Sequence, residues 1–382
     1  MSHKAVEMRK GSTKKQRLEH VDAMRPIKQL GVVANHSFIF FAPTASILAA
    51  SSVLLLHVTR EAFLFISACM LAYAYPALQR QDLSRFYRRR FITVGVPYLC
   101  WTIIYFILSL KTNPLSWSTF FFDLTTGYYQ LYFLVLLMQF YLIFPLLQKY
   151  ILRTRGYHGR LLALSLVVQV VYVSLMHWQI LPYWLRDNWA NRELMSYQFY
   201  LIGGMIAAYH FNAFHDWVVS HAKIILATTL ISAMAAVSWV LIAGVKNIAG
   251  MGYESDPFQP IVIPFNISAI LSVYLLGVWL VQRAEGSWIR RATTSGANNS
   301  YGVYTAQLVF LNCLLWLGLG GSSLPWLLQV VVAIVVTYGG SWLLTAVLAR
   351  TPLAQPLTGR KQATWSSLWP ASRRLSANPA DA

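Results

Sequence analysis

The sequence predicts an all-α fold, a polytopic membrane helical bundle of about ten transmembrane helices with both termini in the cytoplasm. Of its 382 residues, 57% are hydrophobic and only 12% are charged, about half the charged fraction of a typical soluble domain. Apolar segments recur along most of the chain, each long enough to cross about 30 Å of hydrocarbon. Basic residues gather in alternate connections between these segments, which gives each span a direction.

The expected spans follow from the apolar segments in chain order. They lie at approximately residues 26–43, 59–78, 91–110, 129–149, 160–177, 196–211, 223–243, 262–282, 299–318 and 325–348.

The placement of positive charge fixes the orientation of this bundle. With the N-terminus inside, the predicted inner segments carry 26 of the 31 Lys and Arg residues. The other five are Arg60, Lys111, Arg186, Arg192 and Lys246. Such an asymmetry is the positive-inside rule. The net charge of +18 is therefore explained by topology and by attraction to anionic lipid headgroups, and we do not expect nucleic acid as a partner.

The chain divides into three parts. We expect a basic cytoplasmic arm at 1–20, a membrane domain at 21–350, and a disordered cytoplasmic tail at 351–382, where Pro, Ser, Arg and Ala are mixed. Residues 44–58 are too apolar for an ordinary loop and too interrupted for a span, so we expect them to lie along the outer interface. The three cysteines fall in apolar spans without metal or disulfide spacing, and no metal is expected.

The first span carries an arginine at its inner end and a histidine well inside it. Arg25 and His36 are eleven residues apart, about three helical turns and about 16 Å, so both side chains face the same way. Asp22 lies one turn before Arg25, and a surface ion pair with a merely structural His36 is the alternative. Ionisable groups at membrane depth are rare and functional by default, and His36 suits a general base that deprotonates a hydroxyl.

Two further groups of charged residues are candidates. Arg85 and Arg88 lie one turn apart in a predicted inner loop; they either anchor the topology or bind a phosphorylated ligand with their guanidinium groups.

Arg60 and Glu61 open the second span. Adjacent helical residues point about 100° apart, so we do not expect these two to pair simply. Glu61 either orients His36 or an acceptor, or belongs to a capping ion pair at the interface.

The outer loop that begins at Trp178 is rich in aromatic residues, among them Trp184. We favour an interfacial aromatic belt over a platform on which a sugar stacks, and both interpretations stay open.

Four motifs, taken together and in order, resemble the integral-membrane acyltransferase-3 family. The first is Arg25, ten intervening residues and His36. The second is FLFISACMLAY (63–73) in the second span. The third is RFYRRRF (85–91) before a span that carries Pro97, and the fourth is NSYGVYTAQ (299–307). The resemblance covers about residues 18–350.

The resemblance implies a membrane enzyme that O-acylates bacterial cell-surface polysaccharides or related lipid-linked acceptors, in the inner membrane. The co-substrate would be acyl-CoA, in particular acetyl-CoA, with its phosphates held by Arg25, Arg85 and Arg88. His36 would act as general base or as a transient acyl carrier. Glu61, Tyr301 and Gln307 would orient His36 or the acceptor. The implied partners are membrane lipid, the acceptor glycan and glycan-assembly proteins.

The chain departs from the family pattern in two places. Ala68 stands where Gly is common, and Gln307 stands where many members have His. The competing interpretation is a transporter or flippase, because intramembrane Arg, Glu and His residues would serve a substrate or proton path equally well. The arginines near the His36 span, and the scarcity of acidic groups within the spans, favour the acyltransferase.

Overall fold

The computed structural model describes residues 18–110, 114–244, 256–283 and 287–364, and they form helices without any β-strand. The helices are α2 (Glu19–Phe41), α3 (Ile47–Leu56), α4 (Val58–Ala74), α5 (Leu83–Arg90), α6 (Val96–Ser109), α7 (Trp117–Thr126), α8 (Tyr132–Arg153), α9 (His158–His177), α10 (Gln198–Tyr209), α11 (Phe211–Ser220), α12 (Ala222–Ala243), α13 (Ile263–Arg283), α14 (Trp288–Trp316), α15 (Trp326–Leu348) and α16 (Ala354–Thr358). The all-α expectation is confirmed.

Each of the ten expected spans is helical over most of its length. Seven helical segments in the described residues are long and apolar enough to cross a membrane: Ile47–Ala74, Arg80–Ser109, Tyr129–Arg153, Arg155–His177, Ala222–Ala243, Pro260–Arg283 and Trp326–Leu348. The other three expected spans correspond to α2, α10 and α14. Helix α2 carries four charged residues in its first three turns, and α10 has only 12 residues. The chain is thus a multi-pass helical membrane protein.

Residues 44–58 do not lie along an interface as a separate segment, which corrects the sequence-based expectation. Ser46 caps the start of α3 by accepting a hydrogen bond from the Ala49 backbone N–H at 3.3 Å. Helix α3 then runs into α4, with a break at His57. Together they form one bent span of 28 residues. The polar residues that suggested an interruption mark a bend inside a span.

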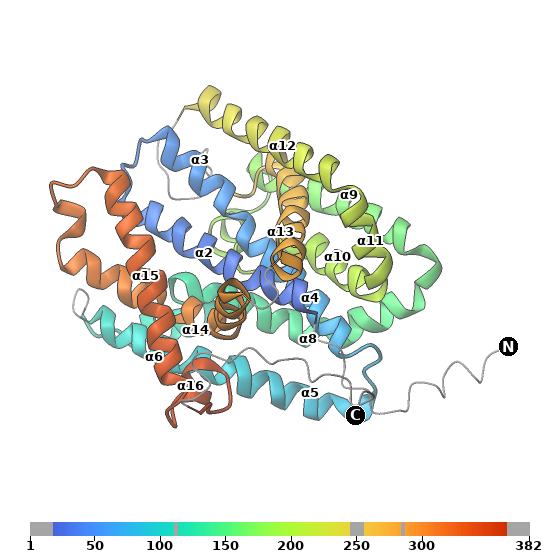
Figure 1. Ribbon diagram of the computed structural model, residues 1–382, viewed down its shortest axis with the longest axis horizontal. Helices are drawn as coiled ribbons and strands as arrows, with labels where there is room; N and C mark the ends of the chain where they lie inside the picture. The colour runs from blue at the N-terminus through green and yellow to red at the C-terminus, as the bar shows by residue number, and fades with distance from the viewer. Residues whose placement is uncertain (1–17, 111–113, 245–255, 284–286, 365–382) are drawn as a thin grey trace, which may run out of the picture.

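Helix α2 lies among five other helices and carries the predicted functional residues. It contacts α3, α4, α13, α14 and α15, and Figure 1 shows it in the middle of the bundle, with α5 and α6 below it and α12 above. Glycines permit the close approach of two neighbours. A Cβ on Gly277 of α13 would lie 2.6 Å from the carbonyl oxygen of His20, and one on Gly296 of α14 would lie 2.7 Å from Pro26.

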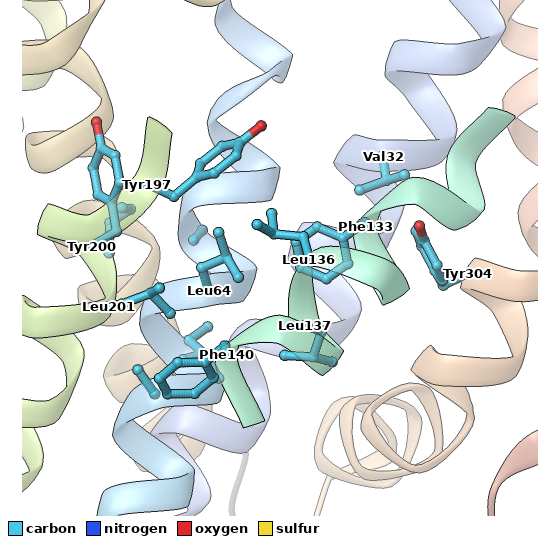
Figure 2. Packing of buried hydrophobic residues seen from close by; sticks show 14 of the residues in the cluster. Val32, Leu64, Phe133, Leu136, Leu137, Phe140, Tyr197, Tyr200, Leu201 and Tyr304 are labelled. Carbon is cyan, nitrogen blue, oxygen red and sulfur yellow. The ribbon is translucent and has the colours of Figure 1, made fainter. Parts of the chain in front are cut away.

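The apolar core between α4, α8, α10 and α14 is aromatic. Figure 2 shows Phe133 and Leu136 of α8 between Leu64 of α4 and Tyr304 of α14. The rings of Phe133 and Tyr304 are 5.9 Å apart and meet edge to face. This layer lies beneath the cavity described below.

The tail that the sequence predicts to be disordered from residue 351 is ordered as far as residue 364. Helix α16 follows α15, and the Trp101 indole of α6 donates a hydrogen bond of 2.9 Å to the Leu357 carbonyl oxygen. The Arg360 guanidinium donates one of 2.7 Å to the Asn298 carbonyl oxygen. Composition did not reveal these contacts, because their partners are more than 60 residues away in the chain. Residues 1–17 and 365–382 lie outside the described residues.

Candidate active site

A cavity of about 320 Å³ opens beside His36, at the end of the bundle where α2 finishes. We call this the far end, and we call the end where α2 begins and α5 lies the basic end. The cavity is lined by Val32, Asn35, His36, Ile39, His57, Thr59, Arg60, Phe63, Tyr129, Gln130, Tyr132, Phe133, Asn191, Arg192, Asp256, Pro257 and Tyr304. Its volume is at the lower end of the range for small-molecule sites, and it combines aromatic walls with a few polar groups.

His36 lines this cavity. Its Nδ1 is buried and, among the described residues, has no hydrogen-bond partner. The Gln307 side chain of α14 lies next to the imidazole, and its Oε1 is likewise buried without a partner among the described residues. A neutral imidazole that carries its proton on Nδ1 keeps its lone pair on Nε2.

The second histidine of the cavity, His57, was missed at the level of the sequence. It lies at the break between α3 and α4, which was assigned to an interfacial segment. Its Nδ1 is 2.6 Å from the Val53 carbonyl oxygen one turn earlier, and it is close enough to His36 for their charges to interact. A lone histidine beside an apolar run does not by itself indicate a cavity residue, because its placement at the cavity depends on how the helices pack.

Arg60 and Glu61 pair with each other, against the sequence-based expectation. Arg60 Nη2 lies 3.4 Å from Glu61 Oε1, because the long arginine side chain folds back across the angle between adjacent helical positions. Arg60 also donates to Asn191 Oδ1, and its guanidinium stacks over the rings of Tyr197 and Phe258. Both charged residues are buried. Arg60 lines the cavity, whereas Glu61 does not.

Three other residues were predicted on the acceptor side, and they lie in three different environments. Gln307 is fully buried beside His36. The Tyr301 hydroxyl donates a hydrogen bond of 3.4 Å to the Val94 carbonyl oxygen, away from the cavity, and Tyr304, one turn later, lines the cavity instead. Trp184, in the turn Trp184–Trp189, is 60% exposed and does not line the cavity.

Around the basic end, the predicted arginines are partly or fully exposed. Arg25 Nη1 lies 3.3 Å from Asp22 Oδ1, and about a third of its side chain is exposed. Arg85 and Arg88 are exposed on α5. Arg90 instead turns inward, with its guanidinium over the rings of Tyr75, Phe86 and Tyr141. Arg90 lies against α8 through Tyr141, and α5 contacts α8.

Two buried polar residues lie on α2 between the ends and were not singled out in the sequence. Lys28 is 2% exposed, and its Nζ lies 3.5 Å from the centre of the Phe63 ring. Gln29 is fully buried, and neither of its amide atoms has a partner among the described residues. Their polarity was visible in the sequence, but their proximity to the charged helix start made them look like ordinary end-of-helix residues.

The arrangement defines a multi-pass membrane protein with an ionisable cavity at one end, exposed arginines at the other, and a single helix, α2, joining them. Residues 18–346 match the family described as an acyltransferase domain, and the chain belongs to the acyltransferase-3 family. The resemblance carried by the four motifs is thereby confirmed, and the protein is an acyltransferase. Comparison with curated proteins and with solved structures gives no match.

Proposed function

We propose that the protein transfers an acyl group, acetyl in particular, from acyl-CoA at the basic end to a hydroxyl of a glycan or lipid-linked acceptor at the far end. The observation that carries this proposal is the placement of His36 in the far-end cavity, on the same helix and the same face as Arg25. Neither residue alone indicates a reaction across the bundle. Together they connect a site for anions with a site for proton or acyl transfer.

The basic end supplies the groups for the donor. Arg85 and Arg88 are exposed one turn apart on α5, and Arg25 at the start of α2 is about a third exposed. Guanidinium groups pair with phosphate oxygens in a planar, bidentate manner. These three residues would hold the phosphates of coenzyme A, while its flexible arm carries the thioester along α2 towards His36.

Near the far end, the cavity supplies the groups for the reaction. His36 Nε2 would either remove the acceptor proton or receive the acyl group, with Gln307 orienting the imidazole. In both cases the carbon–sulfur bond of the thioester breaks and a carbon–oxygen bond to the acceptor forms. The cavity of about 320 Å³ has room for a short acyl chain and part of a sugar. Trp184 and Tyr301, outside its lining, remain acceptor-binding predictions.

The proposed orientation follows from the charge distribution. Both termini and the basic end lie in the cytoplasm, where coenzyme A is made, and the far-end cavity faces the outside of a bacterial inner membrane. Coenzyme A then stays in the cytoplasm while the acyl group crosses the bundle. Membrane lipid and proteins of glycan assembly would be its neighbours.

The test is binding and turnover of acetyl-CoA by the purified protein in detergent. A ligand that binds only the folded state raises thermal stability by mass action. We expect the wild type to be stabilised and to release free coenzyme A slowly. Arg85→Ala/Arg88→Ala should lose stabilisation, and His36→Ala should keep stabilisation but lose turnover.

Arg153→Ala is the matched control, because Arg153 is exposed at the end of α8 and belongs to neither site. It should behave like the wild type. If neither acetyl-CoA nor longer acyl esters change the stability of the wild type, donor binding is excluded. Transport of a polar substrate then becomes the working hypothesis.

A further inference from the structure

The far-end cavity contains two imidazoles, and the proposed function uses only one. His36 comes from α2 and His57 from the break between α3 and α4, and both line the same space. A direct transfer from thioester to hydroxyl needs a single base, so the second imidazole requires an explanation.

The hydrogen bond of His57 fixes which of its nitrogens can react. Nδ1 lies 2.6 Å from the Val53 carbonyl oxygen, which can only accept, so Nδ1 carries the proton. Nε2 is then the nitrogen with a free lone pair. The same carbonyl also accepts the His57 backbone N–H at 3.1 Å, which holds the ring at a fixed place in the bend.

The bend itself sets the depth of His57. A Cβ on Gly31 of α2 would lie 2.6 Å from Thr59 Cγ2 of α4, so the two helices touch there. His36 lies five residues further along α2 towards the far end, and His57 lies two residues from Thr59 in the same direction. The two histidines therefore reach the cavity from neighbouring helices, at depths that differ by about 4.5 Å of helical rise.

We propose that the two histidines divide the transfer, with His36 receiving the acyl group and His57 acting as the base for the acceptor hydroxyl. This inference rests on the proposed function and assigns a catalytic role that sequence comparison does not. Both imidazoles line one cavity, which suits a nucleophile and a base acting in succession better than one base acting alone.

The transfer takes place in two steps that conserve atoms and charge. His36 Nε2 attacks the thioester carbonyl, a carbon–nitrogen bond forms, and the carbon–sulfur bond breaks. Coenzyme A departs as its thiolate, and the proton stays on His36 Nδ1, which leaves a protonated acyl-imidazole. The acceptor oxygen then attacks the acyl carbon while His57 Nε2 takes the hydroxyl proton. The carbon–nitrogen bond breaks, which restores neutral His36 with its proton on Nδ1, and His57 passes the hydroxyl proton to the coenzyme A thiolate or to water.

The test separates the two steps in proteoliposomes given acetyl-CoA. The first step is measured without acceptor, as exchange of radiolabelled coenzyme A into acetyl-CoA. The second is measured as acetyl release to water and to hydroxylamine, whose nitrogen attacks without first losing a proton. We use His57→Asn, because the asparagine amide keeps a donor near the Nδ1 position and removes the base.

We expect His57→Asn to retain exchange and release to hydroxylamine within about threefold of the wild type, and to lose release to water by about 100-fold or more, the usual contribution of a general base. His36→Asn should lose all three. His221→Asn is the matched control, since His221 Nδ1 also bonds a carbonyl four residues earlier, that of Trp217 at 2.8 Å, outside the cavity. It should resemble the wild type in every assay.

Three results would overturn the inference. Loss of exchange in His57→Asn would assign His57 to the donor step or to the fold, and unchanged release to water would show that it is not a base. Exchange that persists in His36→Asn would remove the acyl-imidazole. If the wild type itself neither binds nor exchanges acetyl-CoA, the proposed function fails together with this inference. The other three results leave donor binding by the wild type intact, so the two kinds of failure are distinguishable.

Discussion

Arg60 at the far end of the bundle is buried, whereas Arg85 and Arg88 at the basic end are exposed. Arg60 is enclosed by Glu61, Asn191 and two aromatic rings, whereas Arg85 and Arg88 face outward on α5. A buried charge must be matched by fixed partners, because its desolvation is costly. An exposed arginine keeps its donors available for a ligand. The same residue type thus lines a cavity at one end and keeps its donors exposed at the other.

The largest effect should follow from breaking the buried pair. Arg60→Leu leaves the Glu61 carboxylate buried without its cation, and removing one member of such a pair costs about 3–5 kcal/mol. We expect a marked fall in the unfolding temperature in detergent and loss of turnover. Arg85→Ala should change that temperature by no more than an ordinary surface substitution. Equal unfolding temperatures of Arg60→Leu and Arg85→Ala would show that the burial of Arg60 does not contribute to stability.

The next effect concerns the orientation of His36 inside the cavity. Gln307→Leu removes the amide that lies next to the imidazole, and a small misplacement of a catalytic group can lower activity by about 100-fold. We expect kcat to fall by this factor while the affinity for acetyl-CoA and the unfolding temperature stay unchanged. Gln307→His, the residue many family members carry, should retain most of kcat. A fall in donor affinity instead would place Gln307 at the donor site.

A smaller effect should follow from salt at the basic end. The Debye length falls from about 10 Å at 0.1 M to about 3 Å at 1 M, so contacts between exposed arginines and phosphates weaken. We expect the Kd of acetyl-CoA to rise about 2- to 10-fold over this range, since each exposed charge pair contributes about 0.2–1 kcal/mol. In Arg85→Ala/Arg88→Ala that salt dependence should largely disappear. An unchanged dependence would move the phosphate site away from α5.

The smallest effect should come from Trp184→Ala. Trp184 is exposed and outside the cavity lining, as expected of a residue in an interfacial belt, so turnover and stability should remain within about twofold and about 0.5 kcal/mol of the wild type. Titration of a soluble glycan acceptor gives the decisive readout. A rise in KM for the acceptor with unchanged kcat would instead make Trp184 a stacking platform.

Much of the fold was predictable because hydropathy acts locally. A segment long and apolar enough to span a membrane must satisfy its backbone hydrogen bonds internally, so it becomes a helix whatever its neighbours are. The expected spans are helical for that reason. The errors lie where contacts are distant: residues 44–58 form part of a bent span, and residues 351–364 are held by α6 and α14.

In the candidate site, too, some features follow from local spacing and others depend on distant contacts. The sequence by itself determined that Arg25 and His36 share a face of one helix, since helical periodicity fixes it, and that Arg85 and Arg88 lie on a basic segment. Only the tertiary structure decided that Gln307 reaches His36, that Tyr304 rather than Tyr301 lines the cavity, and that His57 joins them. Those contacts depend on how helices far apart in the chain pack and bend, which local spacing does not encode.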